Sequence, residues 1–378
     1  MATRLTAEAE LVIARCRELA DCTEEPGRIT RTFLSPPMRR VHELVGWWMR
    51  EVGLEVSIDA VGNIRGVRGS ERRLIIGSHL DTVPNAGAFD GILGVVLGIA
   101  LANECRDVAV VGFSEEEGVK FGVPFIGSRA VVGTAFELMD SRVEESIRAY
   151  GLEPGRLGEA RMAGAGYFEI HIEQGPVLEH HDLSVGIVDA IAGQSRYSVT
   201  FTGSANHAGT TPMHLRNDAL VQCAKWILEV ERTARATDGL MATVGRCEVS
   251  PGAGNVIAGL VRASLDVRHK NDSVRRSAAA ALIEDLDATL LMDVPATPMD
   301  AAMTAQLADA VEQEGYPTFR LTSGAGHDAM VMAQAMPAAM LFVRSPNGVS
   351  HHPDETVRLE DVEAALRCAK RFVRSRHG

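Results

Sequence analysis

Three consecutive glutamates, Glu115, Glu116 and Glu117, directly follow the apolar segment VAVVGF and one serine. Neighbouring carboxylates repel each other, and the dipole of a helix start would explain one or two of them. Three in a row fit better if they face a cation. Because adjacent residues point in different directions, one glutamate can bind a metal ion while its neighbour takes a proton from a water molecule.

His79 and Asp81 occupy a comparable position after another apolar segment, in LIIGSHLDTV. Asp90 follows in AFDGI, between glycine-rich stretches and at the start of a predicted helix. Taken alone, His79 could be a polar loop residue and Asp90 a helix N-cap. Ligands bind at the carboxyl ends of parallel strands, so the position of both residues favours a site.

Histidines also follow or end two further apolar segments. In YFEIHIEQG, alternation places His171 on the polar face of a strand, and SPNGVSHHPDE places His351 and His352 in a turn after AAMLFV. Histidine and carboxylate ligands without a thiolate suit Zn²⁺, Mn²⁺ or Co²⁺. Five side chains can bind two such ions if one carboxylate bridges them. The candidate ligands are His79, Asp90, Glu117, His171 and one of His351 and His352.

The elements that must position these side chains alternate between helix and strand. Helical spacing occurs at about 6–20 and 37–53 and in GILGVVLGIALANE, and short apolar runs occur in LEVSID, RLIIGSHL and VAVVGF. Continuous apolar strands between helices are typical of a mostly parallel sheet covered on both faces. The sequence therefore predicts an α/β catalytic domain.

From about Arg196 the pattern changes to one of strands with a polar face. RYSVTFTGS and VIAGLVRASLDVRH alternate, and between them a helix at about 217–236 carries the apolar stripe Leu220, Ala224, Ile227 and Leu228. Such strands around a helix are typical of an antiparallel α+β domain. We expect this smaller domain, residues 195–303, to be inserted into a catalytic domain formed by residues 1–194 and 304–378.

Composition excludes several classes of protein. The net charge of −12 argues against a nucleic-acid surface, although local arginines or metal ions can still attract an anionic substrate. Six scattered cysteines without a CxxC pair indicate free thiols in a reducing compartment. The sequence shows no signal peptide and no apolar stretch near the length of a membrane span. We therefore expect a cytoplasmic protein without membrane contact.

Together, the motifs GSHLDTV, FDG, FSEEEGVKFG, HIEQGPVLE, ANHAGTTPM, GAGHDA and GVSHHP resemble those of the M20 metallopeptidase-like amidohydrolases. The chain is most similar to the branch that contains allantoate amidohydrolase, N-carbamoyl-L-amino-acid hydrolase and β-ureidopropionase, over about residues 26 to 360. HIEQG and NHAGTTPM separate this branch from the ordinary dipeptidases. The resemblance implies a zinc-peptidase-like catalytic domain, interrupted by a lid domain through which two subunits form a homodimer.

The resemblance also implies a role for each motif residue. It makes Asp90 the bridging metal ligand and Glu116 the general base, with Asp81 orienting His79 from behind. The other implied metal ligands are His79, Glu117, His171 and His351, and His352 takes a variable position. In the smaller domain, His207 would polarise the scissile carbonyl, and Asn255 and Arg268 would bind the substrate carboxylate. Weaker candidates for substrate contact are Gln174, Gln194 and the backbone from Gly324 to Gly326.

The expected activity is hydrolysis of a ureido or carbamoyl C–N bond in a small carboxylate, with release of ammonia and carbon dioxide. Allantoate is the first choice, because TRTFLSPPM resembles the allantoate-type members. An N-carbamoyl-L-amino acid or a β-ureido acid is the alternative, and an aminoacylase or dipeptidase is more distant. A non-catalytic binding protein is a different class, and the loss of Glu116 or of a metal ligand would have favoured it.

Overall fold

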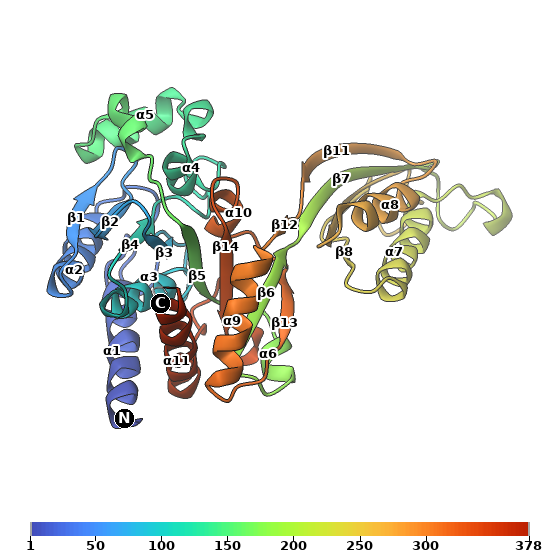
Figure 1. Ribbon diagram of the computed structural model, residues 1–378. Helices are drawn as coiled ribbons and strands as arrows, with labels where there is room; N and C mark the ends of the chain where they lie inside the picture. The colour runs from blue at the N-terminus through green and yellow to red at the C-terminus, as the bar shows by residue number, and fades with distance from the viewer. Residues whose placement is uncertain (1, 377–378) are drawn as a thin grey trace. The chain divides into compact units, whose positions relative to one another are not determined.

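The computed structural model describes residues 2–376 and divides into two compact units (Figure 1). The larger unit contains the residues up to Asp189 and those from Met299 onward, and the smaller unit is Ala190–Pro298. The smaller unit is therefore an insertion in the sequence of the larger one. Its boundaries fall slightly N-terminal to the predicted ones, which were before residue 195 and after residue 303.

One sheet of nine strands contains all the described strands of the larger unit, together with β12 at the end of the inserted segment. Its strands are β1 (Glu55–Ile58), β2 (Ile64–Arg68), β3 (Leu74–His79), β4 (Val108–Phe113), β5 (Gly166–Ile172), β6 (Val185–Ile191), β12 (Thr297–Pro298), β13 (Arg320–Ser323) and β14 (Ala338–Val343). Their order is β1-β2-β4-β3-β5-β14-β6-β12, and β13 pairs with β6. The four central strands β4, β3, β5 and β14 are parallel, whereas β1, β2 and β6 pair antiparallel at the sides. All residues of the four central strands are buried, which confirms the predicted parallel core.

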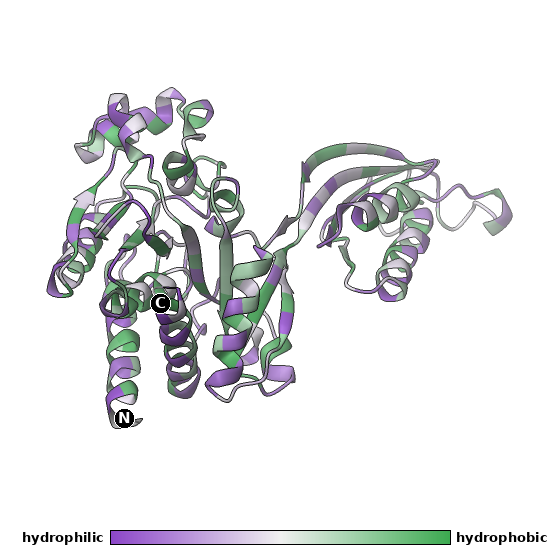
Figure 2. Ribbon diagram, viewed as in Figure 1, coloured by the Kyte–Doolittle hydropathy of each residue, from purple (hydrophilic) through white to green (hydrophobic). Residues whose placement is uncertain are grey.

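Helices cover this sheet. They are α1 (Ala2–Ala20), α2 (Met38–Glu51), α3 (Ile92–Leu101), α4 (Ile126–Val132), α5 (Ser141–Tyr150), α6 (Val177–His180), α9 (Ala301–Gln313), α10 (Asp328–Met332) and α11 (Leu359–Ser375). Helix α11 contacts α1, α3 and α9, while α10 contacts both α4 and β5. In Figure 2 the central strands are mainly green, that is hydrophobic, whereas α11 also carries purple, hydrophilic residues. Short 3₁₀ helices occur at Ala102–Glu104, Ala135–Leu138, Pro154–Ala160, Met213–Leu215 and Pro346–Gly348.

Helix α3 lies unusually close to the sheet. A Cβ atom at Gly94 would lie 2.2 Å from the carbonyl oxygen of Ile170 and 2.9 Å from Cβ of Ser78. Only glycine permits this approach, since a larger residue would push the helix away from β3 and β5. The small residues of GILGVVLGIALANE therefore fix the position of the chain that follows Asp90.

The smaller unit is an antiparallel sheet packed against two helices. Its strands are β7 (Gly193–Thr202), β8 (Met241–Thr243), β9 (Cys247–Ser250), β10 (Leu260–His269) and β11 (Asp287–Val294), and its helices are α7 (Ala219–Ala236) and α8 (Asp272–Leu282). The strands follow the order β11-β7-β10-β8, with β9 also paired to β10. The apolar residues predicted to alternate along β10 are all buried, namely Val261, Ala263, Leu265 and Val267.

The predicted apolar stripe of α7 is wrong. Leu220 and Leu228 are exposed, with relative accessibilities of 43% and 66%. The buried face of α7 instead consists of Ala219, Cys223, Trp226 and Val230. Both sets of residues have helical spacing and lie on adjacent faces of the helix, so periodicity alone could not decide which one faces the sheet.

Within residues 2–376, no helix combines the length and the apolar character that a membrane crossing requires.

Arg31 is a fully buried cation that joins the N-terminal segment to the end of β3. Its Nε donates to the carbonyl oxygen of Leu80 at 2.8 Å, and its Nη1 donates to those of Leu19 and Cys22 at 2.9 and 3.0 Å. Burial lowers the pKa of the guanidinium to about 10. Because this value is still well above neutral pH, the side chain stays charged.

We expect Arg31→Ala to lower the free energy of unfolding by about 3 kcal/mol, because it removes three hydrogen bonds to backbone carbonyl groups and opens a cavity. Denaturant unfolding measures this change. The exposed Arg28→Ala is the control and should change stability by less than about 0.5 kcal/mol. Equal effects of the two substitutions would show that the buried contacts of Arg31 contribute little.

Candidate metal centre and active site

The candidate ligands of the larger unit meet at the carboxyl ends of its parallel strands. His79 is the last residue of β3, the glutamates follow β4, and His171 is the penultimate residue of β5. Asp90 lies two residues before α3, and His351 lies in the loop after β14. The sheet order places β4, β3, β5 and β14 side by side, so these residues converge although they are far apart in sequence.

Two groups of ligand atoms share Asp90. His79, Asp90 and His171 form one group, and Asp90, Glu117 and His351 form the other, with the ligand atoms of each group within 4.8 Å of one another. Oδ1 of Asp90 lies 3.3 Å from Nε2 of His171 and 3.8 Å from Nε2 of His79. Oδ2 lies 3.2 Å from Nε2 of His351, which is also 3.4 Å from Oε1 of Glu117. The two oxygens of Asp90 thus face two different sets of donors, as a bridging carboxylate requires.

Backbone carbonyls orient the two buried histidines. Nδ1 of His79 lies 3.0 Å from the carbonyl oxygen of Asp81, and Nδ1 of His171 lies 2.9 Å from that of Ile172. Because a carbonyl oxygen can only accept, each Nδ1 carries the proton and each Nε2 keeps a free lone pair. Nε2 of His171 is buried and makes no hydrogen bond. Such an orphaned nitrogen beside a carboxylate fits a metal ion as the missing partner.

The charges in the site also fit a divalent cation. Burial, followed by the charge of the neighbouring Asp90, raises the pKa of Glu117 to about 8. Burial, followed by the charge of Glu117, raises the pKa of Glu116 well above its ordinary value. A cation among these groups would restore their ionised form. The residues therefore fit a divalent metal ion, which either His79, Asp90 and His171 or Asp90, Glu117 and His351 would hold.

The three consecutive glutamates have different surroundings. The carboxylate of Asp81 accepts hydrogen bonds from the backbone N–H groups of Glu116 and Glu117, at 3.1 and 3.2 Å. Glu115 has a positive φ of 51° and turns away, with Oε1 accepting from the N–H of Lys120 at 2.9 Å. Oε2 of Glu116 lies 4.0 Å from Nε2 of His79. Asp81 therefore holds the backbone that separates Glu116 from Glu117, and its carbonyl oxygen, more closely than its carboxylate, orients His79.

Gln174, predicted to contact substrate, lies against a metal ligand. Its Nε2 is 3.1 Å from both carboxylate oxygens of Asp90 and 3.5 Å from Nε2 of His351. Gly324, another predicted substrate contact, is exposed in the turn between β13 and α10.

The smaller unit brings its candidate residues together in two pairs. Asn255 and the exposed His207 lie on neighbouring segments, joined by a hydrogen bond from the N–H of Ala208 to the carbonyl oxygen of Asn255 at 2.9 Å. Gln194 and Arg268 face each other across β7 and β10.

Gln194 and Arg268 bind the same carboxylate, that of Asp266. Nε and Nη2 of Arg268 donate to it at 2.9 and 3.1 Å, and Nε2 of Gln194 donates at 2.6 Å. The Arg196 guanidinium donates to it at 2.8 Å. Asp266 thus holds both candidate substrate residues in fixed positions.

Sequence reasoning missed four polar residues of the larger unit, namely Glu169, His327, Asp328 and Glu355, all of which are buried. Glu169 and His327 form a further group with His171, and the His171 and His327 rings lie 4.4 Å apart. Two signals were present: Glu169 alternates with His171 along its strand, and His327 and Asp328 belong to the motif GAGHDA. Glu355 lies four residues after His351 and carried no signal of its own.

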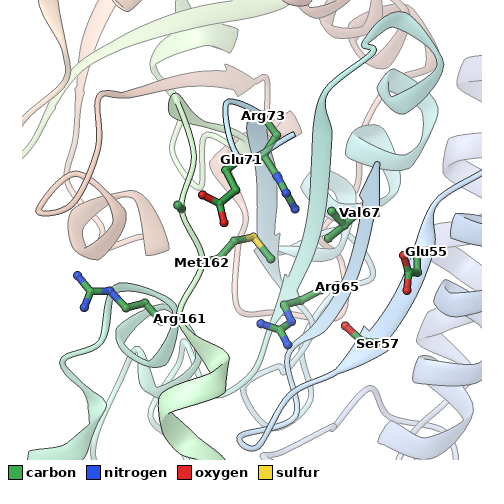
Figure 3. A pocket seen from close by; sticks show the side chains of 9 residues that line it. Glu55, Ser57, Arg65, Val67, Glu71, Arg73, Arg161 and Met162 are labelled. Carbon is green, nitrogen blue, oxygen red and sulfur yellow. The ribbon is translucent and has the colours of Figure 1, made fainter. Parts of the chain in front are cut away.

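A cavity of about 320 Å³ lies elsewhere in the larger unit, and none of the candidate ligands lines it (Figure 3). Its lining includes Arg65, Glu71, Arg73 and Met162. Arg73 lies just before β3, whereas His79 ends that strand. The cavity is therefore at the opposite end of β3, roughly 20 Å from the metal ligands at the usual rise per residue.

The family match, the similar sequences and the similar solved structures agree with one another. Residues 75–375 match peptidase family M20/M25/M40. A probable allantoate deiminase of Oryza sativa subsp. japonica is 37% identical, over 93% of this chain and 85% of that protein. An N-carbamoyl-L-amino acid amidohydrolase of Geobacillus stearothermophilus is 38% identical, over 94% of this chain and 95% of that protein. The crystal structure of an amidase of the hydantoinase/carbamoylase family from Burkholderia multivorans has a TM-score of 0.89 and 30% identity, over 97% of both chains.

Proposed function

Because the chain belongs to peptidase family M20/M25/M40, we propose that it is a dinuclear metal-dependent amidohydrolase that cleaves a ureido or carbamoyl C–N bond of a small carboxylate. The observation that carries this proposal is the pair of ligand groups that share Asp90, with Glu116 beside them. The candidate ions are Zn²⁺ and Mn²⁺, and Co²⁺ fits the same donors. When bound, such ions supply Lewis acidity, which lowers the pKa of water and polarises a carbonyl oxygen.

Glu116 acts as the general base and then as the general acid. Its carboxylate takes the proton of the attacking water, whose oxygen forms a bond to the carbonyl carbon. Glu116 then returns the proton to the leaving nitrogen as the C–N bond breaks. Cleavage of this one C–N bond of a carbamoyl group releases one nitrogen as an amine or ammonia and leaves the carbonyl carbon as a carbamic acid on the other nitrogen. The carbamic acid then breaks down into carbon dioxide and the second nitrogen product, so that the final products are ammonia, carbon dioxide and the remaining amine. His207 donates to the carbonyl oxygen as negative charge develops there.

Arg268 and Asn255 bind the substrate carboxylate. The planar guanidinium of Arg268 matches a carboxylate in a two-point contact, and Asp266 holds it in place.

We expect Arg268→Ala to raise KM about 10- to 100-fold with a smaller change in kcat, since a charge-assisted contact contributes about 1.5–3 kcal/mol. Steady-state kinetics test this. Arg262→Ala is the matched control, because Arg262 lies on the same face of the same strand and is exposed. Similar KM values for Arg268→Ala and the unsubstituted enzyme would place the substrate carboxylate elsewhere.

We propose allantoate as the substrate, and an N-carbamoyl-L-amino acid as the alternative. The two relatives whose names carry these substrates are almost equally similar, at 37% and 38% identity. Purified protein with Mn²⁺ or Zn²⁺ should therefore be assayed for ammonia release from allantoate and from a panel of N-carbamoyl amino acids. Cleavage of N-acyl amino acids or dipeptides, without any ammonia release, would contradict the proposed substrate class.

We also propose that the protein is a homodimer through the smaller unit. Its support is a set of large apolar side chains that are exposed on this unit: Leu220, Leu228, Met241, Leu290 and Leu291. Contiguous exposed apolar surface is typical of protein interfaces, and we propose that these side chains contribute to such a surface. The mass of the protein in solution, measured by light scattering, tests this part of the proposal. The cytoplasmic location stays a prediction.

A further inference from the structure

Glu355 is a buried carboxylate that joins two loops, each of which carries a metal ligand. Its side chain is 4% exposed. Oε1 accepts hydrogen bonds from the backbone N–H groups of Phe89 and Asp90, both at 3.0 Å. Oε2 accepts from the hydroxyl of Ser350 at 3.1 Å. One side chain therefore contacts both the backbone of the shared ligand Asp90 and the residue before His351.

A turn in the loop around His351 brings the Glu355 carboxylate to this position. His351 has a positive φ of 56°, and the N–H of Glu355 donates to the carbonyl oxygen of His352 at 3.0 Å. With this turn, the His351 side chain reaches the Asp90 carboxylate, and the Glu355 side chain reaches the backbone of Phe89 and Asp90. The hydroxyl of Ser350 also lies 3.5 Å from Oδ2 of Asp90, the oxygen that faces His351.

Gly87 makes room for Glu355. A Cβ atom at position 87 would lie 2.3 Å from Cβ and 2.4 Å from Oε1 of Glu355. These distances are far below van der Waals contact, so any larger residue at position 87 must displace the Glu355 side chain. The clash would arise from space alone, because φ of Gly87 is not in the left-handed region.

We propose that Glu355 is a positioning residue of the metal centre, which fixes Asp90 and His351 in the arrangement that binds an ion between them. The proposal rests on the proposed metal-dependent function. Glu355 belongs to neither of the two ligand groups that share Asp90, and it acts through the two ligands. Without it, the N–H groups of Phe89 and Asp90 would lose this acceptor, and the link from their backbone to Ser350 would be lost.

The test measures metal affinity separately from folding. Metal-free protein is titrated with Mn²⁺ or Zn²⁺ in a calorimeter, and its denaturant unfolding is followed without metal. Glu355→Ala should weaken the binding of an ion about 10- to 100-fold, as loss of such supporting contacts does in other metal sites. Glu355→Gln keeps an acceptor oxygen and should lose much less affinity. Excess Mn²⁺ should restore most of kcat in Glu355→Ala.

Two further variants keep the test decisive if Glu355→Ala does not fold. Gly87→Ala leaves Glu355 in the sequence but displaces it, and should weaken metal binding as Glu355→Ala does. Asp354→Ala is the control for the loop, because the Asp354 side chain is 84% exposed, and Gly155→Ala is the control glycine with open space around it. Both controls should bind metal like the unsubstituted protein.

The outcomes separate this inference from the proposed function. If the unsubstituted protein binds two ions and both Glu355→Ala and Gly87→Ala bind them equally well, the positioning role is wrong and the metal centre stands. A drop in metal-free stability with unchanged affinity would also overturn the role, since Glu355 would then support only the fold. If the unsubstituted protein binds no ion, the proposed function itself fails.

Discussion

Glu116→Gln should lower kcat by about 100- to 10,000-fold, the range that general acid–base catalysis contributes. Glutamine has nearly the same shape as glutamate but cannot take the proton of the attacking water. Metal binding should stay largely intact, because the two groups that share Asp90 do not include Glu116. Kinetics and metal titration of the same preparation measure both effects.

Glu115→Gln is the matched control for this substitution. Glu115 is buried next to Glu116 but turns away, and its amide replacement can still accept from the N–H of Lys120. Its effect on kcat should be small. Glu116 also forms a ligand group with His79 and Glu117, so loss of an ion is the alternative result for Glu116→Gln. That result would make Glu116 a ligand, whereas near-normal turnover with both ions bound would exclude it as the base.

Removal of the divalent ions with a chelator should abolish turnover and leave a protein that becomes less stable as the pH rises from about 6.5 to about 8. In the metal-free protein, burial raises the pKa of Glu117 and of Glu115 to about 8, from an ordinary value of 4.5. The folded chain therefore binds more protons than the unfolded chain between these pH values. Stability must then fall with rising pH, because the unfolded state binds fewer protons.

Other groups act in the same direction within this pH window. The hydrogen bond to Asp90 raises the pKa of His351 to about 9, so the stability from its protonated form is also lost as the pH rises above 6.5. Burial lowers the pKa of His79 and of His327, which has the opposite effect on stability, but only below about pH 6.5. Above this pH the carboxylates and His351 dominate.

Denaturant unfolding at pH 6.5 and pH 8, with and without Mn²⁺, measures the difference. Metal-loaded protein should lose less stability, since bound ions favour the ionised carboxylates and add their binding energy to the folded state. Glu117→Gln removes one titrating group and should flatten the pH dependence of the metal-free protein. A metal-free protein with equal stability at both pH values would show that the carboxylates are not buried together in solution.

Much of the catalytic unit was predictable because its signals are local. Continuous apolar runs such as LIIGSH and VAVVGF predicted buried parallel strands, and β3 and β4 are buried throughout. Polar residues at the ends of such strands predicted a common site, since parallel strands end at the same edge. The smaller unit was less predictable at α7, where two apolar stripes have the same spacing and only packing against β10 decides which is buried.

The residue types of the candidate ligands could be predicted from the sequence, but which of them lie next to Asp90 could not. The residues alone left His351 and His352 as alternatives, and the resemblance favoured His351. The structure places Nε2 of His351 3.2 Å from Asp90, whereas His352 is exposed and faces Asp354. A turn with positive φ at His351 decides this, and no pattern of residue types shows it.

By itself, the sequence determined the family, the alternation of strands and helices, and the histidines and carboxylates that stand at strand ends. Only the tertiary structure decided that Asp90 faces two sets of donors, that backbone carbonyls fix the free nitrogen of His79 and His171, and that Glu355 joins loops 265 residues apart. The physical reason is the distance along the chain over which the determining interactions act. Strand and helix patterns depend on neighbours a few residues away, whereas these contacts depend on the order of the strands in the sheet and on the path of the backbone between them.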